Sequence, residues 1–172
     1  MKFLVMSDSH GVPENVTRIT NHYRDKVDLI FHTGDSEVLA DDPSWNEVDF
    51  YVAGNCDFDP NYAEILVVDT PVGKVFMTHG HLHNVKLSKD QLVSAAKAEG
   101  AKYAFFGHTH VTYLNYINDM IVLNSGSVSY PRSRHGIKTF AILEIFDDYV
   151  HVDFIDDQFN IIESLSQDLP RP

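Results

Sequence analysis

The segment Lys2-Phe-Leu-Val-Met-Ser-Asp-Ser-His10 sets a short apolar run directly before polar residues. An apolar run of this length, Phe3–Met6, is typical of a strand buried on both faces of a sheet. Asp8 and His10 follow it, and residues two apart leaving a strand can point the same way. The segment therefore predicts a buried strand whose end presents a carboxylate beside an imidazole. For this pair alone, a helix-capping Asp next to a surface His is the alternative.

The same arrangement recurs along the chain: an apolar run, then a short polar segment rich in metal-binding side chains. The runs predict strands at 2–6, 28–32, 47–53, 74–78 and 103–106. Ligands of open α/β sheets gather beyond the carboxyl ends of strands, so we expect the following segments to converge on one crevice. These segments are Asp8-Ser-His10, Gly34-Asp35, Gly54-Asn55, His79-Gly-His81 and Gly107-His-Thr-His110.

The remaining periodicity predicts helices at 13–24 and 88–99, the second capped by Ser88 and ended by Gly100. Further strands are predicted at 63–69, 112–117, 120–123, 139–146 and 150–155. Strands and helices alternate in the first half, and hairpins dominate the second. This order predicts an α/β fold in which two packed mixed β-sheets lie between outer helices. The 172 residues suit a single domain, 1–172, and we expect the tail from about residue 165 to be frayed.

The charge balance excludes several classes of partner. The chain has 25 acidic and 13 basic residues, a formal charge of −12. We therefore expect no binding to duplex nucleic acid or to a membrane surface, because Lys and Arg drive both. Cys56 is the single cysteine, which excludes an internal disulfide and a Cys-rich zinc site. No signal peptide or stretch of about 20 apolar residues is evident, which predicts a cytoplasmic protein.

The polar segments together offer imidazole, carboxylate and amide groups but no thiolate cluster. Taken singly, Gly-Asp and Gly-Asn are common turn dipeptides. Their joint occurrence at strand ends favours a site for Mn²⁺, Fe, Zn²⁺ or Ni²⁺ over one for Ca²⁺. Sharing one carboxylate would make a two-ion site of the kind that catalyses phosphoryl transfer. The candidate metal ligands are Asp8, His10, Asp35, Asn55, His79, His108 and His110.

This ordered set resembles the calcineurin-like metallophosphoesterases, in particular their small single-domain prokaryotic phosphodiesterases. The resemblance runs from residue 1 to about residue 155 and implies a four-layer α/β/β/α sandwich. Three further segments fit that subgroup: Gly54-Asn-Cys-Asp57, Thr78-His-Gly-His81, and Asn124-Ser-Gly-Ser-Val128 followed by Pro131-Arg132.

The resemblance also implies how the ligands divide between two divalent ions. Mn²⁺ is the expected metal, with Ni, Fe, Zn or Mg as alternatives. A water or hydroxide between the ions would be the nucleophile, and Asp35, Asn55 and His108 would hold it and position the phosphate. One ion would be held by Asp8, His10, Asp35 and His110, and the other by Asp35, Asn55, His79 and His108.

Three more residues are candidates for substrate contact. Many members of the superfamily carry His after the Gly-Asn pair, whereas this chain carries Cys56, which is a weaker proton donor or else a packing residue. His81 can reach the substrate phosphate or the surroundings of a metal. Arg132 can bind phosphate, although a solvated loop charge is an equal alternative.

These features predict a metal-dependent phosphodiesterase or phosphatase acting on small phosphate esters or nucleotide-like substrates. Two alternatives come from the same superfamily: a protein-binding scaffold like the retromer subunit, and a nuclease. A complete ligand set argues against the scaffold, and the acidic charge argues against the nuclease. The sequence does not indicate an oligomeric state.

Overall fold

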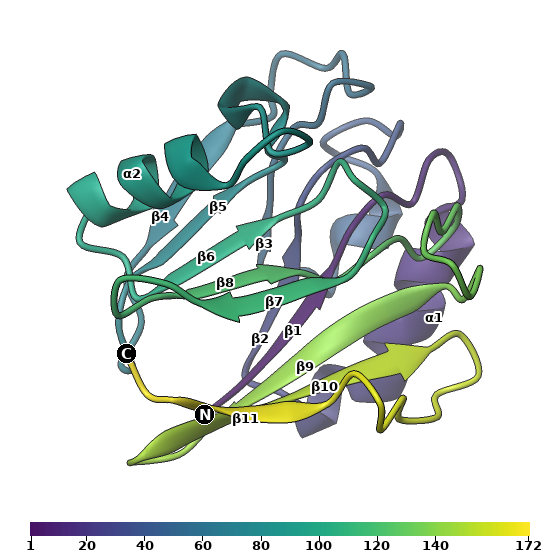
Figure 1. Cartoon of the computed structure of the whole chain (residues 1–172). Helices are drawn as coiled ribbons and strands as arrows, with labels where there is room; N and C mark the ends of the chain where they lie inside the picture. Colours follow the sequence, from purple (N-terminus) through teal and green to yellow (C-terminus); the bar gives the residue numbers. More distant parts are fainter.

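The computed structural model describes residues 1–172 as two β-sheets packed face to face (Figure 1). The first sheet has the strand order β11-β10-β9-β1-β2-β3, and the second has β4-β5-β6-β8-β7. The first sheet comprises β1 (Lys2–Met6), β2 (Leu29–His32), β3 (Phe50–Tyr51), β9 (Thr139–Ile145), β10 (Tyr149–Asp156) and β11 (Gln167–Pro170). The second comprises β4 (Ile65–Val68), β5 (Val75–Thr78), β6 (Tyr103–Phe106), β7 (Tyr113–Tyr116) and β8 (Ile121–Asn124).

Each sheet has a parallel centre and antiparallel edges. Strands β1, β2 and β3 run parallel in the first sheet, and β5, β6 and β8 run parallel in the second. The other pairings are antiparallel, including β1 with β9 and β4 with β5. Both sheets are therefore mixed, as predicted. The parallel pairing brings the carboxyl ends of β1 and β2 to one edge, and likewise those of β5 and β6.

Alternate residues of the central strands face two different cores. Phe3 and Val5 point between the sheets, whereas Leu4 and Met6 face outward. The inner core includes a group of aromatic rings packed edge to face, with Phe31 centred 5.4 Å from Phe3 and 5.3 Å from Phe105. Burial on both faces explains why these strands are continuous apolar runs in the sequence.

A helix covers the outer face of each sheet (Figure 1). Helix α1 (Pro13–Tyr23) packs Val16 and Ile19 against the first sheet, and α2 (Asp90–Ala98) packs Leu92 against the second. Three short 3₁₀ turns complete the chain: η1 (Arg24–Lys26), η2 (Pro43–Trp45) and η3 (His81–His83). The layers are helix, sheet, sheet and helix, so the predicted sandwich is confirmed. Neither α-helix has the length and apolar content needed to cross a bilayer.

Two local predictions differ from the structure. The strand predicted at 47–53 is reduced to Phe50–Tyr51, because the Asp49 carboxylate accepts the Ile30 N–H at 2.7 Å in place of further strand pairing. Helix α2 begins at Asp90 with Lys89 as its N-cap, one residue later than a helix capped by Ser88 would begin. The Ser88 hydroxyl still accepts the Asp90 N–H at 3.1 Å, so it satisfies an N-terminal donor of the helix.

The tail that was expected to fray instead forms the edge strand β11, antiparallel to β10. Leu169 lies opposite Val150 and packs against the inner core. The His151 ring bridges Asp168 Oδ1 at 2.7 Å and Asp153 Oδ1 at 3.2 Å. Pairing and these polar contacts hold a segment whose sequence, Gln-Asp-Leu-Pro, shows no strand alternation.

We expect the docking of β11 to weaken as pH rises. The hydrogen bond to Asp168 raises the pKa of His151 above its usual value. A raised pKa means that this contribution is complete below pH ~6.5 and is lost as pH rises through the folded-state value. Hydrogen exchange at the β11 amides, corrected for intrinsic rates, should therefore be faster at about pH 8.5 than at about pH 5.5. In His151→Gln the corrected rates should not differ between the two pH values.

Candidate metal centre

The loops that follow four central strands meet at one edge of the sandwich. Two of these strands, β1 and β2, belong to the first sheet, and β5 and β6 belong to the second. The polar segments therefore approach the same point from both sheets. Of the residues predicted to bind metal, the loops after these four strands supply Asp8, His10, Asp35, His79, His108 and His110.

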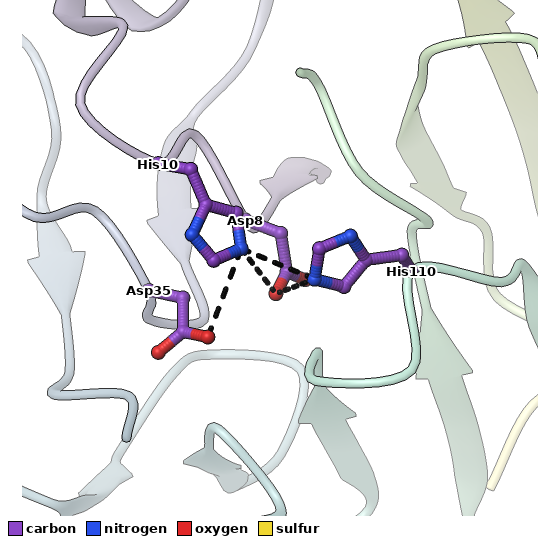
Figure 2. Close-up of side chains that lie close together, drawn as sticks. All are labelled: Asp8, His10, Asp35 and His110. Atoms are coloured by element: carbon purple, nitrogen blue, oxygen red, sulfur yellow. Dashed lines mark hydrogen bonds and ion pairs between the residues drawn. The ribbon is translucent and has the colours of Figure 1, made fainter. Parts of the chain in front are cut away.

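Four of these side chains form one group of possible metal ligands: Asp8, His10, Asp35 and His110, whose donor atoms all lie within 4.8 Å of one another. Figure 2 shows the two imidazoles and the two carboxylates turned toward a common point. His110 Nε2 lies 3.1 Å from Asp8 Oδ1 and 3.1 Å from His10 Nε2. His10 Nε2 lies 3.8 Å from Asp35 Oδ2.

A second group adjoins the first and consists of Asp35, His79 and His108, again with donor atoms within 4.8 Å of one another. His79 Nε2 lies 3.2 Å from Asp35 Oδ2. Asp35 is thus common to both groups, in the place where the sequence analysis expects a bridging ligand.

Buried atoms without partners show that these groups suit a cation. Both carboxylate oxygens of Asp8 and the Nε2 atom of His79 are buried and form no hydrogen bond. Buried polar atoms are nearly always satisfied, because leaving one unpaired costs about 1–3 kcal/mol. Oxygen and imidazole lone pairs gathered at one point are the donors that a divalent transition metal takes. The residues present therefore fit a divalent metal.

The outer nitrogens of three histidines are held by neighbours. Nδ1–H of His79 donates to the Thr33 carbonyl at 2.8 Å, and that of His110 donates to the Tyr130 carbonyl at 2.6 Å. Nδ1–H of His10 donates to Glu37 Oε1 at 2.6 Å. These contacts fix the tautomer, so each Nε2 lone pair faces the centre, as in metal sites with an oriented imidazole.

The backbone of the site is unusual as well. Ten non-glycine residues have positive φ, and five of them are candidate ligands; Glu37, at φ 60°, is a sixth residue of the site. Asp and His tolerate this region better than bulky residues do, but each still costs free energy. Clustering of such residues is typical of functional sites, where the surrounding structure imposes the conformation. The five ligands are Asp8, His10, Asp35, His108 and His110.

The charges in the site act strongly on one another. Burial opposes ionisation of Asp35, but the close contact with the His79 ring and the hydrogen bond from the Cys56 N–H outweigh it and lower the pKa of Asp35. The Asp35 and Asp8 carboxylates likewise outweigh burial at His79 and raise its pKa. Burial and the charges of His79 and Lys86 lower the pKa of His108 to about 4. His108 is therefore a neutral imidazole near pH 7, the form that binds a metal.

Asn55 and Cys56 lie on the rim of the centre. The exposed Asn55 amide donates to Cys56 Sγ at 3.2 Å, and no side-chain hydrogen bond joins it to the other candidate ligands. The Cys56 N–H donates to Asp35 Oδ1 at 2.8 Å, which places this loop against Asp35. Burial and the Asp35 charge raise the pKa of the Cys56 thiol to about 11, so it stays protonated near pH 7.

The other two candidates also lie nearby. The half-buried His81 ring is centred 5.6 Å from that of His79 and 6.1 Å from that of His108. Arg132 donates its backbone N–H to the His110 carbonyl at 2.9 Å. Its side chain lines a recess of about 320 Å³ together with His10, Glu37, His110 and Tyr130.

Asp57 and Glu37 support the site and have no role in the sequence analysis. The Asp57 carboxylate accepts the backbone N–H groups of Ser36, Glu37 and Gly54 at 2.7–2.9 Å, and so ties two loops together. The order Gly54 then Asp57 is not a turn signature, so the sequence alone does not indicate these bonds. Nothing in the sequence pairs Glu37 with His10.

The loop after β8 forms the floor beneath the first strand end. The Ser127 hydroxyl donates to the Asp8 carbonyl at 2.8 Å, and the Ser129 hydroxyl donates to the Ser9 carbonyl at 2.8 Å. These two hydrogen bonds tie the loop after β8 to the backbone that carries Asp8.

Comparisons with known proteins agree with this geometry. A model of the calcineurin-like phosphoesterase superfamily domain matches residues 1–148. The "Probable metallophosphoesterase YsnB" of Bacillus subtilis is 35% identical over 165 residues, 96% of each chain. The "Phosphodiesterase MJ0936" of Methanocaldococcus jannaschii is 26% identical over 162 residues, 84% of this chain and 93% of that protein.

Solved structures show the same likeness. A crystal structure of a conserved Streptococcus pneumoniae protein, described as a predicted phosphoesterase, matches with a TM-score of 0.94 and 36% identity. The match covers 99% of this chain and 97% of that one. A zinc-bound Vps29 from Entamoeba histolytica covers all of both chains with a TM-score of 0.72. At 17% identity, it shares the fold alone.

Proposed function

This chain belongs to the calcineurin-like phosphoesterase superfamily, a family of metal-dependent phosphoesterases, and we propose that it is a phosphodiesterase with a dinuclear centre. One observation carries the proposal: two groups of donor atoms share the Asp35 carboxylate. Asp8, His10, Asp35 and His110 would hold one ion. Asp35, His79 and His108 would hold the other, with Asn55 completing the set from the rim.

Two divalent ions held by these residues would supply an activated water and positive charge to neutralise the phosphoryl oxygens. The chain's own residues keep the donor atoms in place and in the right protonation state. Asp35 stays ionised because its pKa is lowered, and His108 stays neutral because its pKa is about 4. Asn55, whose amide is exposed on the rim, can donate a hydrogen bond to a phosphoryl oxygen.

The rim favours diesters over monoesters. A monoester carries about −1.5 to −2 charges near pH 7, whereas a diester carries one. The Glu37 carboxylate, whose side chain is 43% exposed beside His10, repels the second charge. Cys56 stays a neutral thiol and is a weak proton donor to a leaving group. The relative from Methanocaldococcus jannaschii is itself named a phosphodiesterase.

Within this proposal the whole chain, 1–172, is one catalytic domain that works in the cytoplasm on small phosphate esters or nucleotide-like substrates. Mn²⁺ is the proposed metal, because carboxylates suit it and because availability and geometry, rather than affinity alone, select the ion at a mixed site. The formal charge of −12 disfavours duplex nucleic acid and anionic membranes as partners, and with them a nuclease function. The fold is shared with Vps29, but all seven ligand-competent residues are kept here, which favours an enzyme over a scaffold.

The test of this function uses protein stripped with a chelator. We expect no hydrolysis of bis-(p-nitrophenyl) phosphate without metal and restored hydrolysis with Mn²⁺, with p-nitrophenyl phosphate cleaved more slowly. Parallel assays with Ni²⁺, Mg²⁺ and Zn²⁺ rank the metals by the hydrolysis rate that each restores. Two bound ions with no turnover of either ester would contradict the enzymatic proposal and favour the scaffold. Absence of metal binding would contradict the centre itself.

Replacing Glu37 should loosen the centre without dismantling it. Glu37→Gln keeps the shape of the side chain but removes the charge that holds His10 Nδ1–H. Loss of such a supporting partner costs about 10–100-fold in metal affinity, and we expect a fall in this range by Mn²⁺ titration. Glu99→Gln, an exposed carboxylate just beyond α2, is the matched control and should bind as the parent does. Equal affinities in both variants would show that Glu37 does not orient His10.

A further inference from the structure

A basic recess lies beside the metal centre. It has a volume of about 420 Å³, and its charged lining residues are Lys86, Lys89 and Arg132. No carboxylate lines it, although the chain carries 25 acidic and only 13 basic residues. This concentration of positive charge is a local reversal of the net charge, and it needs an explanation.

The recess adjoins the centre through two residues. Thr109 lines it and lies between His108 and His110 in the chain. Arg132 lines both this recess and the one that contains His10 and His110. A ligand in the basic recess would thus be next to a phosphate at the metals.

The three cations are free to bind an anion. None of them pairs with a carboxylate, since the Lys and Arg ion pairs of the chain are made by Lys2, Arg24 and Arg171. Lys89 is held in place by a hydrogen bond from Nζ to the Val85 carbonyl at 2.6 Å. Its Nζ also lies 5.1 Å from the centre of the Tyr113 ring. A fixed ammonium with donors to spare, beside a lysine and an arginine, is suited to a phosphate group.

The neighbouring groove has the opposite character. It measures about 980 Å³, and Glu37, Asp42 and Asp59 line it together with apolar residues such as Phe58. The recess at the centre shares Glu37 with this acidic groove and Arg132 with the basic recess. An anionic group attached to a bound ester is therefore repelled on one side and attracted on the other.

We propose that Lys86, Lys89 and Arg132 form a subsite for a second phosphate of the substrate. This rests on the proposed function and narrows it: the substrate is a small phosphodiester of which one esterified group carries a further phosphate. The uncharged group of the ester then lies on the acidic, partly apolar side.

Two matched esters test the subsite. Thymidine 5′-(p-nitrophenyl phosphate) and its 3′-phosphorylated analogue differ by one phosphate, and water cleaves the P–O bond to release p-nitrophenolate from each. We expect the added phosphate to lower KM about tenfold or more, the effect of one good charged contact. In the double variant Lys86→Ala/Arg132→Ala this KM ratio should fall to near one. Lys97→Ala, an exposed lysine of α2, should keep the ratio of the parent.

A metal-free measurement separates the subsite from catalysis. Thymidine 3′,5′-bisphosphate should bind the chelator-treated protein, and its affinity should fall about tenfold in the double variant but not in Lys97→Ala. If neither ester is cleaved, the proposed function fails, and this titration still decides on the subsite. Three results would each overturn the subsite. The first is equal KM values for the two esters in the parent, and the second is a KM ratio that persists in the double variant. The third is a bisphosphate affinity that is the same in the double variant as in the parent.

Discussion

Asp35→Asn is expected to lower metal-dependent diester hydrolysis about a thousandfold or more, because this carboxylate belongs to both donor groups. Asparagine keeps the size of the side chain, and its carbonyl can still accept the Cys56 N–H that now bonds to Asp35 Oδ1 at 2.8 Å. The substitution therefore removes charge and one donor atom from the centre while leaving the loop packing in place.

The same variant should separate folding from metal binding. Without metal, Asp35→Asn should lower the Tm modestly, because the contact with His79 that lowers the pKa of Asp35 stabilises the folded protein near pH 7 and is lost with the charge. With metal, the parent gains stability by mass action, about 2.7 kcal/mol at a concentration 100 times Kd, and the variant should lose most of this gain.

Two measurements check this pair of expectations. Equilibrium dialysis counts the bound Mn²⁺ ions, and thermal unfolding with and without Mn²⁺ gives the stabilisation. Asp148→Asn, which changes an exposed turn carboxylate, is the matched control for charge. A variant that binds two ions and retains turnover within about tenfold of the parent would contradict a shared role for Asp35.

The sequence predicts which candidate ligands gather at one place, because their placement follows from local rules. Asp8, Asp35, His79 and His108 each stand a few residues after an apolar run, and parallel strands bring their carboxyl ends to one edge. The alternation of side chains between the inner and outer cores along β1 and β6 likewise follows from strand geometry. Predictions of this kind need no knowledge of which loops touch.

The residues that the sequence does not predict depend on contacts between distant loops. Glu37 lies 27 positions from His10, and Asp57 lies 20 from Glu37, so their hydrogen bonds appear only once the strands are assembled. The strand β11 is missed for a similar reason: its order comes from pairing with β10 and from His151 rather than from its own pattern. The strand predicted at 47–53 is too long because the Asp49 side chain replaces a backbone partner.

Gly54→Ala should disrupt the metal centre more than any other addition of a single methyl group there. The backbone of Gly54 lies outside the left-handed region, so alanine can adopt its conformation and only the added Cβ matters. That atom would overlap Asp35 Oδ1 and the backbone nitrogen of Asp35. A backbone atom cannot rotate away as a flexible side-chain end can, so the two loops must separate.

The separation has two expected costs. Overpacking of this kind destabilises by about 1–3 kcal/mol, and here it also strains the hydrogen bond from Gly54 N–H to Asp57 Oδ2. A displacement of about 1 Å at Asp35 should lower kcat about 100-fold. Thermal unfolding of metal-free protein and a Mn²⁺ titration measure the two effects.

Gly136→Ala is the control, since no atom lies within 4 Å of its added Cβ, although its φ of +60° is itself unfavourable for alanine. It should bind metal as the parent does despite some loss of stability. The contrast with Asp35→Asn is diagnostic. Loss of the Asp35 charge should remove most of the metal-dependent stabilisation at a modest cost to the metal-free fold, whereas loss of space at Gly54 should strongly affect both. A Gly54→Ala protein with the stability and metal affinity of the parent would mean that the Asp35 loop does not depend on its contact with Gly54.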